Sequence, residues 1–263
     1  MTVPRDESPD QPLLGNDPGR EAEFDAYAEQ YDQLLNDSIR LSGERGEYFT
    51  DYKIRDLARL WQSLGRGRDR PHILDFGAGV GASIPLFQQH FPGAQLTCAD
   101  VSARSLQLAE RRFGSSASFV VCAGSTLPFA DDCFDLAFAA CVFHHIPPES
   151  HGGVLRELLR VLRPGGALML YEHNAWNPVV VRVVRGCPFD ERAILIPAPT
   201  LQRGLRTAGF ANVVTTHRVF FPSPLRRLRW LEDWLGWLPL GAQYHVVGRK
   251  PVPTAGTATP PQS

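Results

Sequence analysis

The sequence contains no apolar run of about eighteen residues, so it predicts no helix that spans a membrane. Its first residues are polar, acidic and interrupted by proline, and they contain no apolar signal core. The formal net charge is only −1, so there is no broad cationic field that would attract nucleic acid. We therefore expect neither a membrane span nor a nucleic-acid partner.

Cysteine is also scarce, with five residues in 263, and an odd number cannot be fully paired. No CxxC pair is present, and no cysteine and histidine stand at the spacing of a metal site. The sequence therefore predicts no disulfide framework and no zinc or other metal site. Cys98, Cys122 and Cys141 lie in or beside apolar runs, where a free cysteine packs as a small hydrophobic residue. This usage favours a reducing, cytoplasmic location.

The composition that remains suits one folded domain with additions, because 43% of the residues are hydrophobic. Residues 1–20 and 251–263 are rich in residues such as proline and glycine and are predicted to be disordered. Residues 21–66 carry apolar side chains at three- and four-residue steps, which predicts a helical arm. We expect this arm to act as a lid over a ligand pocket, with a hydroxyl from Tyr31. The alternative is that its tyrosines only pack on a helix face.

Strand and helix patterns alternate through residues 67–250, which predicts a parallel sheet with helices on both faces. Two stretches, near 173–198 and 221–240, are expected to be insertions that cap a substrate. The expected strands are 72–76, 95–99, 118–122, 134–140, 167–171, 212–220 and 243–248.

The central feature is residues 73–81, where a short apolar strand enters a turn with glycine at 77, 79 and 81. Glycine has no Cβ, so the backbone can turn sharply and approach a ligand closely. A helix follows, and its N-terminus points free N–H groups at the turn. Asp100 ends the next apolar run about twenty residues later, where a carboxylate can hold a ribose diol. Together these features indicate a cofactor that contains a nucleoside.

Residues 77–82 also fit the dinucleotide fingerprint, so the turn alone leaves two cofactors open. Asp75 lies two residues before the first glycine. A carboxylate at this place suits the ammonium group of an amino acid and would repel a pyrophosphate. The turn therefore favours S-adenosylmethionine over NAD.

Further landmarks follow in a fixed order: Leu-Pro-Phe at 127–129, Phe-Asp-Leu at 134–136, His144 with His145, and Leu-Arg-Pro-Gly-Gly at 162–166. With the glycine turn and Asp100, this series resembles class I S-adenosylmethionine-dependent methyltransferases over roughly residues 24–250. The small-molecule branch with the ubiquinone/menaquinone-type enzymes is the most similar. The resemblance implies a Rossmann-like α/β fold whose seven-stranded sheet is mostly parallel with an antiparallel last strand.

The resemblance also assigns the cofactor site. Asp75 would orient the ammonium group, the glycine turn would contact the methionine part, and Asp100 would hold the ribose. Ala123 stands where many members carry an acid, so its neighbours are expected to contact the adenine instead. The predicted cofactor-binding residues are Tyr31, Asp75, Gly77, Ala78, Gly79, Asp100, Val101, Gly124, Ser125 and Cys141.

Polar residues after the fourth and fifth strands are the candidates for the acceptor side. His144 is a candidate general base because imidazole titrates close to neutral pH, the alternative being a wall of the pocket. Glu172, His173 and Asn174 follow the fifth strand, at the sheet edge where open α/β folds bind ligands. The long segment 179–197 and the tryptophans at 230, 234 and 237 are expected to form the acceptor cap.

These observations predict an enzyme that transfers a methyl group to a small-molecule acceptor by in-line displacement. Two alternatives remain open at this level. One is an NAD(P)-dependent oxidoreductase, which shares the glycine turn but lacks a Tyr-x-x-x-Lys pair here. The other is a non-catalytic partner protein that keeps the methyltransferase fold.

Overall fold

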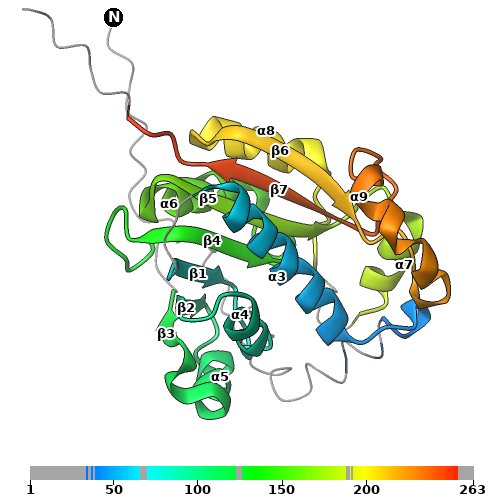
Figure 1. The fold of residues 1–263 in the computed structure, drawn as a ribbon, viewed down its shortest axis with the longest axis horizontal. Coiled ribbons are helices and arrows are strands. Elements are labelled where there is room, and N and C mark those ends of the chain that lie inside the picture. The colour runs from blue at the N-terminus through cyan, green and yellow to red at the C-terminus, as the bar shows by residue number, and fades with distance from the viewer. Residues whose placement is uncertain are drawn as a thin grey trace, which may run out of the picture.

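A seven-stranded sheet runs through the molecule in the order β3-β2-β1-β4-β5-β7-β6 (Figure 1). The computed structural model describes residues 34, 37, 39–65, 70–122, 126–187, 190 and 192–253. Neighbours from β3 to β5 pair in parallel, whereas β7 is antiparallel to both β5 and β6. The strands are β1 (His72–Phe76), β2 (Gln95–Asp100), β3 (Ser118–Val121), β4 (Phe134–Ala140), β5 (Leu162–His173), β6 (Ala211–Arg218) and β7 (Gln243–Arg249). The predicted Rossmann-like α/β fold is confirmed.

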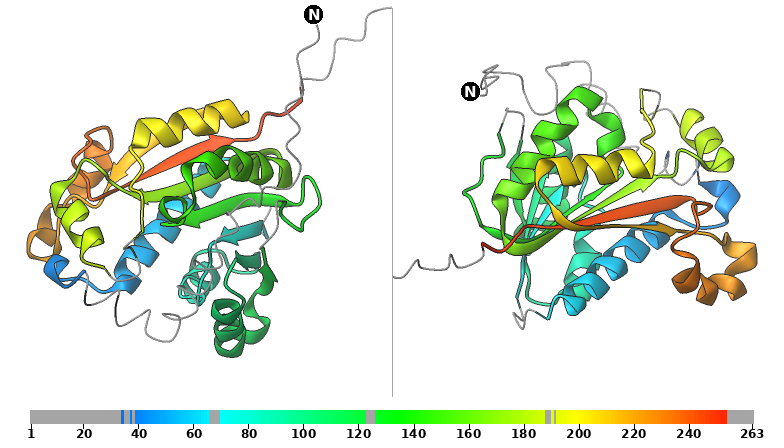
Figure 2. Two further views of the ribbon diagram at one scale, coloured as in Figure 1. Left: turned by 180° about the vertical axis from the view of Figure 1, so that it is seen from behind. Right: turned by 90° about the horizontal axis from the view of Figure 1, so that it is seen from above.

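Helices cover both faces of the sheet (Figure 2). On one face lie α3 (Gly46–Ser63), α4 (Ile84–His90) and α5 (Ala103–Phe113), and on the other lie α6 (His151–Val161) and α8 (Ala198–Ala208). The acceptor-side segments contain α7 (Pro178–Arg185), the 3-10 helix η6 (Ser223–Leu231) and α9 (Glu232–Leu235). The short 3-10 turns are η1 (Arg40–Ser42), η2 (Gly114–Ser116), η3 (Phe143–His145) and η4 (Pro148–Ser150). No helix among these described segments is long and apolar enough to cross a bilayer.

The central strands are apolar on both sides because both sides are covered by helices. In β4, Leu136 and Phe138 belong to the core beneath α3 and α4, whereas Ala137 and Ala139 belong to the core beneath α6 and α8. This alternation follows the two-residue period of a strand. It fixes the register of β4 and therefore the position of the loop that follows it.

β5 is longer than its sequence pattern predicts. The expected strand begins at 167, yet Leu162 already pairs with Phe134 across a register irregularity. Gly165 N–H donates to the Lys250 carbonyl, and Lys250 N–H donates to the Gly166 carbonyl. The Pro-Gly stretch thus follows the end of α6 and continues directly into the sheet, because Lys250, just after β7, supplies hydrogen-bond partners. The predicted start of this strand at 167 was therefore wrong.

α3 is part of the layer of helices that covers the sheet, and Ile54 and Leu57 lie in its core. α3 is also tied to the acceptor-side insert, because the Tyr52 hydroxyl donates to Glu232. Just before α3, Glu44 Oε1 lies 2.7 Å from Arg229 Nη2 of the same insert. The earlier half of the predicted arm, including Tyr31, falls outside the described residues.

Candidate active site

The turn after β1 holds all three of its glycines in the left-handed region, with φ of 80° at Gly77, 53° at Gly79 and 77° at Gly81. Two of them are closely packed. A Cβ on Gly77 would lie 2.3 Å from Val142 Cγ2, and one on Gly81 would lie 2.8 Å from Ile84 Cδ1. A Cβ on Gly79 would meet nothing within 4 Å. Gly79 therefore faces open space, where a ligand can approach the backbone.

The end of β2 holds this turn in place through its N–H groups. Gly77 and Ala78 donate to the Ala99 carbonyl at 2.7 and 3.2 Å, and Gly79 donates to Asp100 Oδ2 at 2.8 Å. These amides are therefore committed within the protein. A ligand would meet the turn at the open surface of Gly79 and at the Asp100 carboxylate beside it.

Asp100 also organises the start of α5, because its Oδ1 accepts the Ser102 N–H at 2.9 Å. The Ser102 hydroxyl in turn accepts the Ser105 N–H and caps the helix, as serine commonly does at this position. Val101 lies between these two polar residues, directly after β2. The glycine turn, Asp100 and Val101 are thus adjacent. The sequence predicted that the turn contacts the methionine part of the cofactor and that Asp100 holds the ribose.

Asp75 is a buried carboxylate near the end of β1, with 3% of its surface exposed. Ser83 Oγ donates to its Oδ2 at 2.5 Å. Burial raises the pKa of Asp75 to about 7 against the opposing effect of this hydrogen bond, and the Asp100 carboxylate raises it further. Neither neighbour is a cation. A cationic ligand group at this place would stabilise the charged form.

Cys141 follows β4 in a left-handed conformation, with φ of 60°, which is uncommon for a residue with a side chain. Lys53 Nζ, from α3, donates to its Sγ at 3.3 Å. Burial raises the pKa of the thiol, but Lys53 and His173 outweigh it and bring the pKa to about 6. Next along the chain, Val142 packs against Gly77, so the end of β4 closes directly onto the glycine turn.

His144 and Glu172 form a buried pair between the ends of β4 and β5, each with 1% of its surface exposed. His144 Nδ1 lies 2.5 Å from Glu172 Oε2, while Glu172 Oε1 accepts the N–H groups of Val142 and Phe143 at 3.2 and 2.8 Å. Burial lowers the pKa of His144, but Glu172 and the carboxylate of Asp190 outweigh it and raise the pKa to about 10. Without a further ligand His144 is therefore protonated, the opposite of the state that a general base requires.

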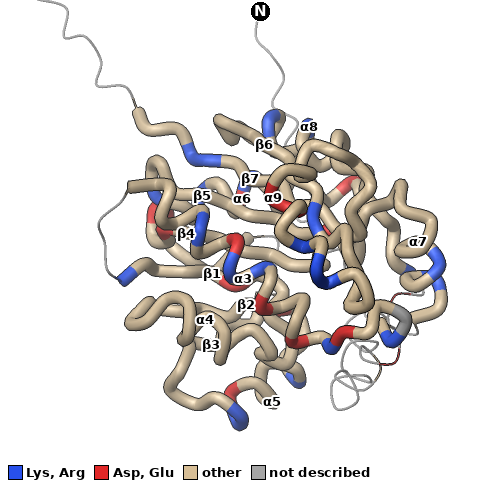
Figure 3. The backbone as a smooth tube through the Cα atoms, turned by 45° about the vertical axis from the view of Figure 1, so that its right-hand side comes forward, with Lys and Arg blue, Asp and Glu red and all other residues tan. Residues whose placement is uncertain are grey.

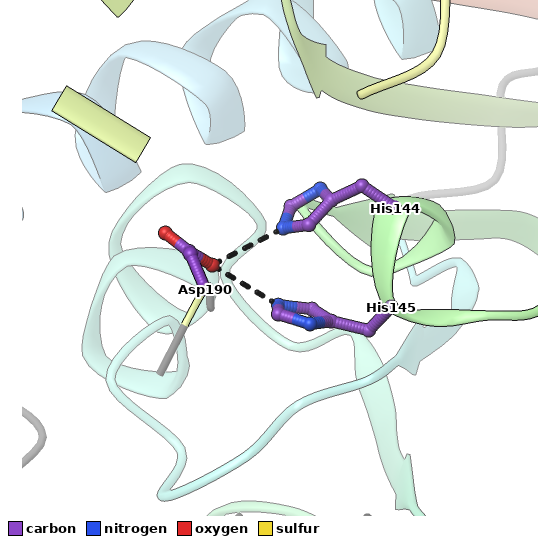
Figure 4. A group of neighbouring side chains, drawn as sticks. All are labelled: His144, His145 and Asp190. Atoms are coloured by element: carbon purple, nitrogen blue, oxygen red, sulfur yellow. Dashed lines mark ion pairs between the residues drawn. The ribbon is translucent and has the colours of Figure 1, made fainter. Parts of the chain in front are cut away.

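The segment after α7 returns to this pair and brings Asp190 to it. Asp190 Oδ1 lies 3.5 Å from His144 Nε2 and 3.3 Å from His145 Nε2 (Figure 4). Burial lowers the pKa of His145, which keeps this imidazole neutral near pH 7. The structure thus joins the two histidines to a residue about forty-five positions further along the chain.

The other two residues predicted after β5 differ in their surroundings. His173 is partly buried, and its ring centroid lies 5.3 Å from that of His144. Asn174 is buried, and its Nδ2 donates to the carbonyls of Pro239 and Gly241 at 3.1 and 2.8 Å. The polar atoms of Asn174 therefore hold the segment before β7 against the end of β5.

The aromatic insert does not point its tryptophans into the site. Trp230, Trp234 and Trp237 are 67%, 76% and 76% exposed, so they lie on the outer surface of the insert. Figure 3 shows charged residues of both signs spread over the molecule. Two predicted cofactor residues, Gly124 and Ser125, lie outside the described residues.

Sequence reasoning missed Lys53, Ser83 and Asp190 as parts of this site, and it named His145 only as a landmark beside His144. For Lys53 a signal was present: it lies on the same helical stripe as Ile54 and Leu57, where a charged side chain is unusual. Asp190 had a weaker signal in the long segment after β5. No local pattern connects Ser83 with Asp75, because the turn between them decides that contact.

The site fits S-adenosylmethionine on two structural observations. The surface at Gly79 is open beside the Asp100 carboxylate, and Asp75 is a buried carboxyl with a raised pKa and no cation among the groups that shift it. A nucleoside that carries an amino-acid ammonium matches both. A pyrophosphate would face two carboxylates and is disfavoured.

Comparison with known proteins agrees with this fit. The family model described as a methyltransferase domain matches residues 74–170, from β1 into β5. The thiol S-methyltransferase TMT1B of Homo sapiens is 33% identical over 216 residues, which cover 75% of this chain and 77% of the relative. The ubiquinone/menaquinone biosynthesis C-methyltransferase UbiE of Desulfotalea psychrophila is 33% identical over 156 residues, covering 59% of this chain and 58% of the relative.

Solved structures share the fold at lower identity. A methyltransferase from Thermotoga maritima, described as a possible histamine N-methyltransferase, has a TM-score of 0.59 at 17% identity and covers 88% of this chain and 99% of its own. Phosphoethanolamine N-methyltransferase 2 of Haemonchus contortus, in complex with S-adenosyl-L-methionine, has a TM-score of 0.58 at 14% identity and covers 87% of this chain and 60% of its own. The glycine turn, the strand order and these relatives lead to one conclusion: the chain belongs to the S-adenosylmethionine-dependent methyltransferases.

Proposed function

We propose that the protein transfers a methyl group from S-adenosylmethionine to a small-molecule acceptor. The observation that carries this proposal is the open surface at Gly79 beside the Asp100 carboxylate, with the buried Asp75 carboxyl close enough to Asp100 to interact with it. S-adenosylmethionine carries the methyl group on a positively charged sulfonium sulfur. Transfer of the methyl group to the acceptor leaves this sulfur as a neutral thioether. The part of the protein is to bind and align the two reactants.

We assign the binding roles to residues at the strand ends. Asp75 binds the ammonium group, directly or through water, and Asp100 receives the ribose hydroxyls while it holds the turn at Gly79. Cys141, at the end of β4, borders the space next to the turn. Tyr31 remains a predicted contact from the lid, and Gly124 and Ser125 remain predicted contacts with the adenine.

On the acceptor side we propose that His144, Glu172 and His173 form one wall and that Asn174 positions the loop above it. The Glu172 and Asp190 carboxylates raise the pKa of His144 to about 10 against the effect of burial, so we assign it a binding role and not that of a base. The segments near 173–198 and 221–240 are proposed as the acceptor cap. We also propose a cytoplasmic location, supported by five cysteines that are all free thiols.

Calorimetry with S-adenosylhomocysteine tests the cofactor assignment. We expect stoichiometric binding, and Asp100→Ala should weaken it by about 1–3 kcal/mol because charge-assisted hydrogen bonds are lost. Asp131→Ala is the matched control, since this carboxylate is 70% exposed and pairs with Arg160 outside the site. Binding of NADH in place of S-adenosylhomocysteine would refute the proposal.

The acceptor is tested separately, by transfer of labelled methyl from S-adenosylmethionine. The chain spans 58% of the UbiE relative and 77% of the thiol S-methyltransferase, whose names give a carbon and a sulfur acceptor. The assay should therefore compare a thiol, a hydroquinone and an amine. Cofactor binding without transfer to any small molecule would favour the non-catalytic alternative.

A further inference from the structure

Three side chains from two distant segments converge on one point beside β4. His144 and His145 come from η3, and Asp190 comes from the segment that follows α7. Both imidazoles direct Nε2 at the same oxygen, Asp190 Oδ1 (Figure 4). One potential ligand atom from each of the three residues lies within 4.8 Å of those of the other two.

The distances within this group are long for hydrogen bonds. The two Nε2–Oδ1 separations are 3.5 and 3.3 Å, whereas N–H···O hydrogen bonds are about 2.7–3.2 Å. A different histidine–aspartate pair in this protein, His90 with Asp51, has a separation of 2.7 Å. Metal–ligand bonds of about 2.0–2.2 Å in a tetrahedron place neighbouring ligand atoms about 3.4 Å apart. The separations around Asp190 therefore match the edges of a metal coordination sphere.

The outer contacts also suit a metal site. Glu172 binds Nδ1 of His144 at 2.5 Å, which turns Nε2 toward Asp190. Metal-binding histidines commonly have such a carboxylate on the second nitrogen, because it fixes the ring orientation and raises its basicity. Glu172 is itself held by the backbone N–H groups of Val142 and Phe143.

The backbone holds Asp190 against the histidines in the same way. Asp190 N–H donates to the Cys187 carbonyl at 3.0 Å, and Ala193 N–H donates to the Asp190 carbonyl at 2.9 Å. Ile194 N–H donates to the carbonyl of His144 at 2.8 Å, which joins the two segments directly. Asp190 is 8% exposed, so the group is shielded from bulk water. A site built in this way is arranged before any ion arrives.

We propose that His144 Nε2, His145 Nε2 and the Asp190 carboxylate bind Zn²⁺ or a divalent transition-metal ion with similar ligand preferences. Two imidazoles and one carboxylate suit zinc better than magnesium or calcium, which prefer oxygen ligands. Three protein ligands are also the number found in zinc sites that keep a fourth position for water or a substrate. With neutral imidazoles, Asp190 and Glu172 contribute two negative charges, which balance a divalent ion.

Metal binding can be measured on the full chain after treatment with a chelator. Titration with Zn²⁺ against a chromophoric competitor should give about one tightly bound equivalent. Asp190→Asn and His145→Ala should each weaken the affinity by at least about 100-fold, and Glu172→Gln by about 10–100-fold. His90→Ala is the matched control, because it removes a histidine from a carboxylate pair elsewhere, and it should leave the affinity unchanged.

Substitution with Co²⁺ gives a second, spectroscopic readout of the same site. The visible bands of tetrahedral Co²⁺ are expected for the wild-type protein and should disappear in Asp190→Asn. Absence of a saturable equivalent of Zn²⁺, or a wild-type affinity in both Asp190→Asn and His145→Ala, would overturn the proposal. Because neither measurement requires methyl transfer, the result is independent of the proposed function.

Discussion

Replacing Asp75 by asparagine should stabilise the protein and weaken cofactor binding at the same time. The carboxyl is 3% exposed, and burial raises its pKa to about 7 from an ordinary value of about 4. A carboxyl with a raised pKa keeps its proton longer in the folded state than in the unfolded chain. Stability is therefore lost as the pH rises from about 4 through about 7, because the unfolded chain ionises first.

The magnitude follows from the pKa difference. The pKa of Asp75 is about 7 in the folded protein and about 4 in the unfolded chain. Compared with a side chain that cannot ionise, this difference lowers the free energy of unfolding by about 4 kcal/mol at about pH 8 and by about 1.5 kcal/mol at about pH 5. Asp75→Asn cannot ionise, and its amide oxygen can still accept the Ser83 hydroxyl. The difference in unfolding free energy between variant and wild type should therefore shift by about 2.5 kcal/mol in favour of the variant over this range.

Urea denaturation of both proteins at the two pH values measures this shift, and calorimetry with S-adenosylhomocysteine measures the binding. Wild-type affinity should fall about tenfold per unit below about pH 7, because Asp75 is progressively protonated. Asp75→Asn should bind about 10–150-fold more weakly than wild type at about pH 8, since a charge-assisted hydrogen bond is lost. Its affinity should also be nearly independent of pH. A variant with the same pH profile as the wild type, for stability and affinity alike, would refute the reasoning.

The remaining predictions concern the glycine turn and a buried ion pair between α3 and β6. Gly79→Ala should reduce the affinity for S-adenosylhomocysteine at least about tenfold, because the new Cβ enters the open space. The free energy of unfolding should fall by only about 1 kcal/mol, the cost of a side chain at a positive φ. Gly77→Ala should instead lower the melting temperature strongly, because its Cβ would lie 2.3 Å from Val142; equal melting temperatures for the two variants would contradict this. Arg218→Met should lower the free energy of unfolding, measured by urea denaturation, by about 3–5 kcal/mol. Arg218 Nε lies 2.8 Å from the buried Asp56, and without the guanidinium the Asp56 charge is poorly compensated. The double variant Arg218→Met with Asp56→Asn should recover part of the loss, and no recovery would show that the pair is not coupled.

Local sequence patterns determined much of this protein. Glycines at alternate positions, with φ of 80°, 53° and 77°, can form this turn where residues with side chains would be strained. Ser102 caps α5 and the apolar runs form the strands, because these preferences act over a few neighbouring residues. The order of strands and helices, and with it the fold, could therefore be predicted from the sequence.

Only the tertiary structure decided which of the polar residues meet. Lys53 reaches Cys141 because α3 packs on the sheet, and Asp190 reaches His144 because the segment after α7 returns to β4. β5 likewise begins at Leu162, because Phe134 of β4 pairs with Leu162 and Lys250, after β7, exchanges hydrogen bonds with Gly165 and Gly166. Such contacts depend on the packing of segments that are far apart in sequence, and no local propensity encodes them. The sequence thus determined where the cofactor turn lies, whereas the folded chain decided which acids, imidazoles and amines surround it.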